Sequence, residues 1–203
     1  MELSKDIVAA KLRRWEKYLN EYRLPKWEDI PDLGLYMEQV IALLSKYLDY
    51  FPPELKEEQF ITAATINNYV RRHLMPEPVK KRYYRVHIAY LVVICSLKQS
   101  LSISTLSTIM PVGIPEEQVR EIYDGYVHRH QRAAEYFVQQ VQLWAADILD
   151  HEVESEFCVD NADELVFTSA VVSGFAKLLA EKLLLLNKHA VEDAARAAQG
   201  GEK

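Results

Sequence analysis

Two adjacent amide side chains and a nearby arginine are the residues best suited to recognition chemistry. Asn67 and Asn68 stand in the middle of a short segment that otherwise suits a helix, where asparagine is a poor helix former. An asparagine amide can pair with N6 and N7 of adenine in the major groove of DNA. Arg71 follows one helical turn after each amide. The spacing therefore predicts contact with DNA, with ordinary solvated or buried helix residues as the alternative.

A basic segment follows these amides. Between Arg71 and Arg85 six side chains are basic and one, Glu77, is acidic, so this segment carries about five positive charges. We expect its lysines and arginines to contact phosphates and a tyrosine, Tyr83 or Tyr84, to pack against a sugar. An ordinary solvated basic loop is the alternative. The full set predicted to contact DNA is Thr65, Asn67, Asn68, Arg71, Arg72, Lys80, Lys81, Arg82, Tyr83 and Arg85.

The rest of the chain is acidic and lacks the patterns of a catalytic site. The formal net charge is -6, and the stretch from Asp147 to Glu164 is strongly acidic. This charge disfavours indiscriminate binding to nucleic acid and is compatible with site-selective binding by a local basic patch. Serine, histidine and aspartate residues are scattered, and neither a glycine-rich phosphate loop nor an HExxH pattern occurs. We therefore expect that the protein is not an enzyme and that it has no cofactor and no metal site.

The cysteines and the apolar segments bear on the cell compartment. Cys95 lies in an apolar run and is expected to be a small buried hydrophobe, while Cys158 receives no role. The N-terminus is charged from Glu2 and shows no apolar core of a secretory leader. No stretch reaches the roughly 18 apolar residues that a membrane span needs. These features predict a cytoplasmic protein with no membrane partner.

Helix caps and prolines divide the N-terminal half into short elements. Ser4, Asp32 and Thr62 are suitable N-caps, and Pro52 ends a helix because proline cannot donate a helical hydrogen bond. Residues 75–78 turn the chain, and the basic, aromatic residues after them suit a hairpin arm. The helices expected are Ser4 to about Tyr22, Leu33 to about Phe51, Ala63 to His73, Val86 to Gln99 and Ser102 to Met110. We also expect a connector over 24–32, in which Trp27 and Ile30 pack against the core, and an extended arm over 80–84.

Two long amphipathic helices are expected in the C-terminal half. Pro115 suits the first helical position, and apolar residues keep helical spacing from there to Ile148. A second helix is predicted over 163–188, and the tail from 191 is expected to fray. Such a helical pair favours a homodimer interface. A further hypothesis is a pocket for a small-molecule effector, lined by Tyr123, Tyr126, Phe137 and Trp144. The alternative is that these aromatic side chains belong to the hydrophobic core.

The segment that carries the amides resembles the MerR-type winged helix-turn-helix regulators. Residues 65–76, TINNYVRRHLMP, match the family's T-I-R-Y-Y-E-R-x-G-L-I-P stretch, and residues 81–83, KRY, match its R-R-Y wing. Residues 87–97 and 101–109 match the two helices that follow. The resemblance implies a helix that enters a DNA groove and a wing that contacts phosphates. The amides at 67 and 68 replace an arginine and an aromatic residue, so the family's base contacts do not transfer.

Most of residues 24–110 is also similar to a bacterial family, common in low-GC Gram-positive bacteria, that is known only as a domain of unknown function. The similarity rests on the stretches 24–27, 32–40, 66–69 and 87–91. It implies a bacterial source and a regulator-like fold, and it supplies no activity.

Together these patterns predict a mainly α fold, a MerR-like winged helix-turn-helix with a long C-terminal helical pair. The expected function is a homodimeric transcription regulator that binds duplex DNA, with an unidentified small-molecule effector as a further hypothesis. The alternative is a protein-interaction module that keeps the helix-turn-helix shape without binding DNA. The expected division is an N-terminal helix and connector over 1–32, the winged unit over 33–110, a dimerisation and effector region over 111–190 and a frayed tail over 191–203.

Overall fold

The protein is mainly helical over the residues that the computed structural model describes, which are 5–48, 61–98, 101–149, 173 and 176–177. The expected fold class is confirmed at this level. Most of the helix predicted over 163–188, together with Cys158 and the tail from 191, lies outside these residues. None of the described helices is both long and apolar enough to cross a membrane. The elements are α1 (Lys5–Glu21), the 3-10 helix η1 (Trp27–Asp29), α2 (Met37–Tyr47), α4 (Ala63–Arg71), α5 (Arg85–Leu97), α6 (Ile103–Ile109), α7 (Glu116–Trp144) and α8 (Ala146–Leu149).

Local sequence signals explain where several helices begin. The Thr62 hydroxyl caps α4 by accepting the backbone N–H of Thr65 at 3.1 Å. Ser102 caps α6 in the same way, with the N–H of Thr105 at 3.3 Å. Pro115 precedes α7 at its N-cap, one position earlier than predicted. Because caps and prolines act within one turn, the starts of these helices are readable from the sequence.

The main hydrophobic core is built around α5. Residues 87–95 of this helix are all buried, so α5 is covered on every side. α2 and α7 pack against it, and the connector before α2 adds the buried side chains of Trp27 and Ile30, as predicted. The core extends over residues 24–123, beyond the 33–110 expected for the winged unit. The connector and the start of α7 therefore belong to the same packed body as α2, α4 and α5.

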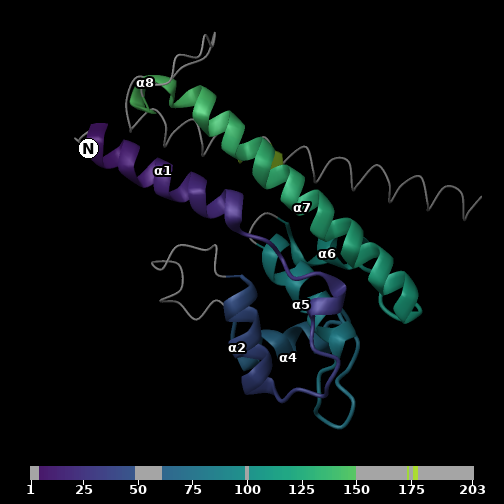
Figure 1. Cartoon of the computed structure of the whole chain (residues 1–203). Coiled ribbons are helices and arrows are strands. Elements are labelled where there is room, and N and C mark those ends of the chain that lie inside the picture. The colour runs from purple at the N-terminus through teal and green to yellow at the C-terminus, as the bar shows by residue number, and fades with distance from the viewer. Residues whose placement is uncertain (1–4, 49–60, 99–100, 150–172, 174–175, 178–203) are drawn as a thin grey trace, which may run out of the picture.

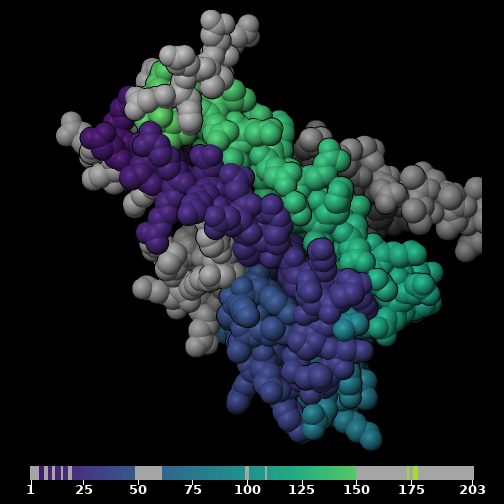
Figure 2. Space-filling view, in the orientation of Figure 1, coloured from purple at the N-terminus to yellow at the C-terminus, as the bar shows by residue number. Residues whose placement is uncertain are grey.

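α1 and α8, with the C-terminal part of α7, form an antiparallel helical arm. Figure 1 shows α1 and α7 side by side, and Figure 2 shows their side chains in contact along the arm. Three polar contacts show that the N-terminal segment runs antiparallel to α7 and α8. The earlier a residue lies in the N-terminal segment, the later its partner lies in the C-terminal one. These contacts join Arg23 to Glu135 (4.0 Å), Glu16 to Gln142 (2.5 Å) and Arg13 to the Leu149 carbonyl (2.9 Å).

A second, smaller apolar cluster lies in this arm. It is separate from the core around α5 and is formed by residues of α1, of α8 and of the junction between α7 and α8. Its buried members are Ala9, Ala145, Ile148 and Leu149.

A backbone pairing between distant segments shows that the predicted start of α2 is wrong. Leu35 and Tyr83 form an antiparallel bridge, with N–H···O distances of 2.8 and 2.9 Å in the two directions. The residues before α2 are therefore extended, and α2 begins at Met37 instead of residue 33. Its N-cap is Tyr36 and not Asp32, and the helix ends at residue 47, short of the predicted 51. The pairing partner is nearly fifty residues away, so no local pattern signals it.

Candidate nucleic-acid interface

α4 presents one apolar face to the core and one face of small or polar side chains to solvent. Ile66 and Tyr69 are 0% and 2% exposed and hold the helix against the core. The opposite side is exposed, and a spacing of three to four residues places its side chains in one stripe. We call this stripe the α4 face. It consists of Ala63, Ala64, Asn67 and Arg71.

The two adjacent asparagines have different surroundings. Asn67 is exposed on the α4 face, and its amide makes no hydrogen bond within the part of the chain that the structure describes. Asn68 is half-buried, and its Oδ1 accepts a hydrogen bond from Arg71 Nη2 at 2.9 Å. Asn68 therefore orients Arg71, and Asn67 is the amide that a ligand can reach. Arg72, at the C-cap of α4, is also exposed.

A basic hairpin connects α4 to α5, and two lysines form its turn. The hairpin lies on the side of the molecule away from the helical arm (Figure 1). Val79 and Arg82 exchange both backbone hydrogen bonds at 3.0 Å, which leaves Lys80 and Lys81 as a two-residue turn. Both lysines are exposed, with φ values of 49° and 62°. Two successive left-handed residues are typical of a type I′ turn, where Asn-Gly is preferred because most side chains are strained. The hairpin thus holds two ammonium groups at its tip despite backbone strain.

Arg82 fastens the hairpin to the segment before α2. Its Nη1 donates to the Gly34 carbonyl at 3.1 Å, and its Nη2 donates to the Tyr36 hydroxyl at 2.7 Å. The guanidinium also lies 4.4 Å from the centroid of the Tyr36 ring, in cation–π contact. A Cβ on residue 34 would lie 2.8 Å from Arg82 Cδ, which explains the glycine there. Arg82 therefore has a structural role, and its contact with a phosphate stays a prediction.

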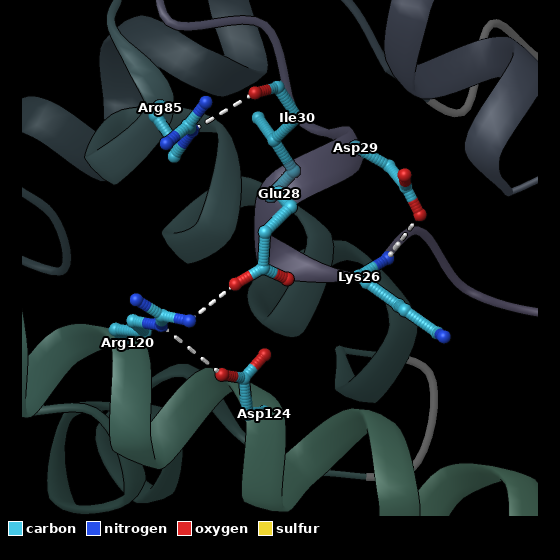
Figure 3. A network of polar contacts seen from close by, with 7 residues as sticks. All are labelled: Lys26, Glu28, Asp29, Ile30, Arg85, Arg120 and Asp124. Carbon is cyan, nitrogen blue, oxygen red and sulfur yellow. Dashed lines mark hydrogen bonds and ion pairs between the residues drawn. The ribbon is translucent and has the colours of Figure 1, made fainter.

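Arg85 holds the connector onto α5 (Figure 3). Its Nε donates to the Ile30 carbonyl at 2.9 Å, and its guanidinium lies 5.8 Å from the centroid of the Trp27 ring. In the same view Arg120 of α7 pairs with Glu28, which ties the connector to α7 as well. Because Arg85 is half-buried and bonded within the chain, we leave it out of the candidate interface.

Two other residues predicted to contact DNA are less accessible, one because it is buried and one because its hydroxyl is part of a helix cap. Tyr83 is 2% exposed, so its ring cannot pack against a sugar. Burial also raises the pKa of Tyr83. Thr65 is half-buried, and its hydroxyl lies 2.9 Å from the Thr62 hydroxyl within the cap of α4. Tyr84, the alternative to Tyr83 for a sugar contact, is 37% exposed and stays available.

The four aromatic residues predicted to line an effector pocket do not converge. Tyr123 is fully buried, and its hydroxyl donates to the Pro25 carbonyl at 2.8 Å. Phe137 and Trp144 contact each other edge to face, with ring centroids 6.5 Å apart. Since an α-helix rises 1.5 Å per residue, Tyr126 and Trp144 lie about 27 Å apart along α7. Tyr123 and Tyr126 pack with the core, and Phe137 and Trp144 pack in the arm, so the described residues do not bring the four side chains to one shared pocket.

Burial raises the pKa of two ionisable groups in the core, a thiol and a phenol. Desolvation raises the pKa of the Cys95 thiol to about 12, against a smaller opposing effect of Lys98. Cys95 is fully buried, which confirms its prediction as a small hydrophobe. Desolvation likewise raises the pKa of Tyr126 to about 12, opposed by its hydrogen bond with Ser96. Neither group is suited to nucleophilic chemistry near neutral pH.

Two surface hollows adjoin this region. The larger, about 580 Å³, lies between the start of α2 and the hairpin tip and is lined by Tyr36, Met37, Glu38, Gln39 and Lys81. The smaller, about 320 Å³, lies beside the connector and is lined by Trp27, Arg85, Glu116, Glu117 and Arg120. Acids and bases are mixed in both. The positive charge of the interface is therefore concentrated at the hairpin tip and at the end of α4.

Sequence reasoning missed three residues of this surface. Ala63 and Ala64 could have been found from the cap at Thr62, which makes them the first turn of α4, opposite the apolar positions. Tyr36 carried no local signal, because its role depends on the approach of Arg82 from the hairpin. A residue that acts through a distant partner is visible only in the fold.

Residues 25–126 match the family described as Domain of unknown function (DUF1836), which is half of the chain. The match begins in the connector, includes the α4 face and the hairpin, and ends within α7. The similarity predicted over 24–110 to a family known only as a domain of unknown function is confirmed and extended into α7. No curated protein and no solved structure matches the chain.

Proposed function

We propose that this chain, which belongs to the DUF1836 family, is a transcription regulator that binds duplex DNA through the α4 face and the hairpin tip. The observation that carries the proposal is the exposed pair Lys80 and Lys81 at left-handed backbone positions. Strained non-glycine residues cluster at functional sites, and each costs on the order of 1 kcal/mol or more. Two ammonium groups held at a fixed tip are suited to phosphates beside a DNA groove.

The order of the elements supports a winged helix-turn-helix of the MerR type. In this proposal α2 and α4, on either side of residues 48–62, are the helix pair, the hairpin is the wing, and α5 is the helix that follows it. The bridge between Leu35 and Tyr83 and the contacts of Arg82 with Tyr36 fasten the hairpin to the start of α2. In such units the second helix enters the major groove and the first crosses the backbone. α4 is thus the recognition helix of the proposal.

A homodimer is the second part of the proposal. Two copies related by a two-fold axis present two recognition helices to a pseudo-palindromic site. Tyr136 and Phe137 are exposed on α7 in the helical arm, where they are suited to contact a second copy.

A hairpin variant separates the charge of the lysines from the structure of the turn. Lys80→Asn/Lys81→Gly supplies the sequence that a type I′ turn prefers, so the free energy of unfolding should rise by about 1–2 kcal/mol. Loss of two phosphate contacts should reduce the slope of log affinity against log salt by about 1.8. Urea unfolding measures the first effect, and fluorescence anisotropy with a random-sequence duplex, scanned over salt, measures the second.

The matched control removes two positive charges elsewhere. Arg14 and Lys17 are exposed on α1, away from the hairpin, and Arg14→Gln/Lys17→Gln should leave the salt slope unchanged. Equal slopes for the hairpin variant and the unchanged protein contradict the assigned role of the lysines. A protein that binds no duplex even at low salt contradicts the function itself.

A protein-interaction module is the second candidate function, because large apolar side chains are exposed beside the hairpin. Contiguous apolar patches often mark protein contacts. The salt-scanned duplex assay distinguishes the two functions, since an interaction module binds no DNA at any salt concentration. The exposed residues are Leu33, Tyr36, Val79 and Tyr84, at 62%, 53%, 54% and 37%.

A further inference from the structure

Resting on the proposed DNA-binding function, we infer that the α4 face reads A·T base pairs in the major groove. Asn67 pairs with adenine, and Ala63 and Ala64 contact the methyl groups of thymine. Arg71, held by Asn68, contacts a phosphate at the other end of the helix. The inference names the base pairs that the site selects, which the hairpin lysines cannot do because phosphates carry no direct sequence information.

The small side chains at the start of α4 allow the helix to approach base edges closely. A helix with its side chains is about 10–12 Å across, and the major groove is about 12 Å wide, so bulky residues hold a helix away from the bases. Ala63 and Ala64 are exposed in the first turn of α4. The first residues of a recognition helix are the ones that reach the bases. Alanine offers one kind of readout there, apolar contact with the thymine methyl.

Asn67 lies one turn further along the same face with its amide available. It follows Ala63 by four residues, about 6 Å along the helix axis. Its amide makes no hydrogen bond within the described part of the chain, whereas the amide of Asn68 is engaged by Arg71. A free amide presents an acceptor and a donor side by side, which matches the N6 donor and N7 acceptor of adenine. Asn67 is therefore the adenine-reading residue of the face.

The first two turns of α4 lack the groups that read guanine and cytosine. Guanine is most often read by arginine or lysine at O6 and N7, and cytosine by a carboxylate at N4. From Ala63 to Val70 the helix carries no charged residue, and its one basic residue, Arg71, stands at its last position. The part of the helix that reaches the bases therefore favours A·T pairs for two reasons. It offers an amide and two methyl groups, and it lacks the charged side chains that read guanine and cytosine.

The test starts with selection of binding sites from duplexes that contain about 20 randomised base pairs, roughly two turns of DNA. The unchanged protein should enrich a half-site with at least one A·T pair. Asn67→Ala should lose the preference at that position. Lys80→Asn/Lys81→Gly should keep the preference and bind all sequences more weakly. Because alanine is the better helix former, Asn67→Ala should not lower the melting temperature.

Base analogues in the selected site then identify the contacting atoms. Replacement of adenine by 7-deazaadenine removes the N7 acceptor and should weaken binding of the unchanged protein about tenfold, with little effect on Asn67→Ala. Replacement of thymine by uracil removes the methyl group and should weaken both proteins by roughly the same few-fold factor, because both keep the alanines.

The outcomes separate this inference from the function on which it rests. A selected site without an A·T preference, or one whose preference survives in Asn67→Ala, overturns the inference and leaves DNA binding intact. Salt-dependent binding of duplex without any enriched site likewise overturns the inference and leaves DNA binding intact. Equal binding of the adenine and 7-deazaadenine duplexes by the unchanged protein also overturns the adenine contact. Failure to bind any duplex at low salt overturns the DNA-binding proposal, and the inference with it.

Discussion

His87 is the buried polar side chain of the described core, and its two ring nitrogens close the segment that carries the lysine turn. Nδ1 lies 3.0 Å from the backbone nitrogen of Tyr84, and Nε2 lies 3.0 Å from the Glu77 carbonyl. A backbone N–H can only donate and a carbonyl can only accept, so the proton is on Nε2. The neutral imidazole therefore joins the two ends of the segment between residues 77 and 84.

Replacing His87 by phenylalanine should destabilise the fold around the hairpin. His87→Phe keeps a ring against Tyr83 and Tyr84 and removes both hydrogen bonds. Two backbone groups lose their partners, so the free energy of unfolding should fall by about 2–4 kcal/mol in urea titrations. His128→Phe, an exposed change of the same kind on α7, should alter it by less than about 0.5 kcal/mol. Equal effects of the two changes would show that the bridge contributes nothing.

His130 gives stability a dependence on pH. Burial lowers the pKa of His130 from its usual value of 6.5, and its ring packs against Tyr22 and Tyr126 at centroid distances of 6.3 and 5.9 Å. The unfolded chain takes up a proton near pH 6.5 that the folded protein resists, so acid favours unfolding. The contribution of neutral His130 is complete above that pH and is lost as the pH falls below it.

The change that tests this is His130→Phe, which keeps an aromatic ring and removes the titration. Between about pH 7.5 and about pH 5.5, the unchanged protein should lose more of its free energy of unfolding than the variant. Urea unfolding at both pH values measures the difference, with His128→Phe as the exposed control. A loss in His130→Phe as large as in the unchanged protein would mean that other groups cause the acid sensitivity.

At the scale of elements, the helices that the sequence predicted well are those with local start signals. The cap predicted at Thr62 gave the start of α4. The helix expected from Ser102 begins one residue later, at Ile103, with Ser102 as its N-cap. Capping and periodicity act over one to three turns, so both can be recognised without the fold. The start of α2 could not be predicted, because Leu35 is held in extended form by Tyr83 from beyond α4.

The hairpin shows the same limit for the candidate site. A type I′ turn is usually signalled by Asn-Gly, and the pair at Lys80 and Lys81 gives no such signal. The sequence also counts every basic residue alike, whereas the fold engages Arg82 and Arg85 in contacts with the chain itself. Composition located the basic segment. Only the tertiary contacts show which of its side chains are bonded within the chain and which are exposed to solvent.

At the scale of the whole molecule, the described residues form two apolar clusters joined by α7. Val119 and Tyr123, in the first turns of α7, belong to the core around α5. Ala145, directly after α7, belongs to the small cluster of the helical arm. The candidate interface lies on the body with the larger core. Units that share few buried contacts can open separately, so the arm should unfold locally without loss of the interface.

Ile148→Ala tests this separation. Ile148 is 3% exposed in the small cluster, and its truncation should cost about 2 kcal/mol, the low end for a buried isoleucine. Hydrogen–deuterium exchange should become faster in α1, α8 and the end of α7, while α5 keeps its protection. Ile88→Ala, a fully buried change in the larger core, should speed exchange throughout. If Ile148→Ala lowers the protection of α5 as much as that of α1, the arm and the body form one cooperative unit, and a second copy bound to the arm could then act directly on the stability of the interface.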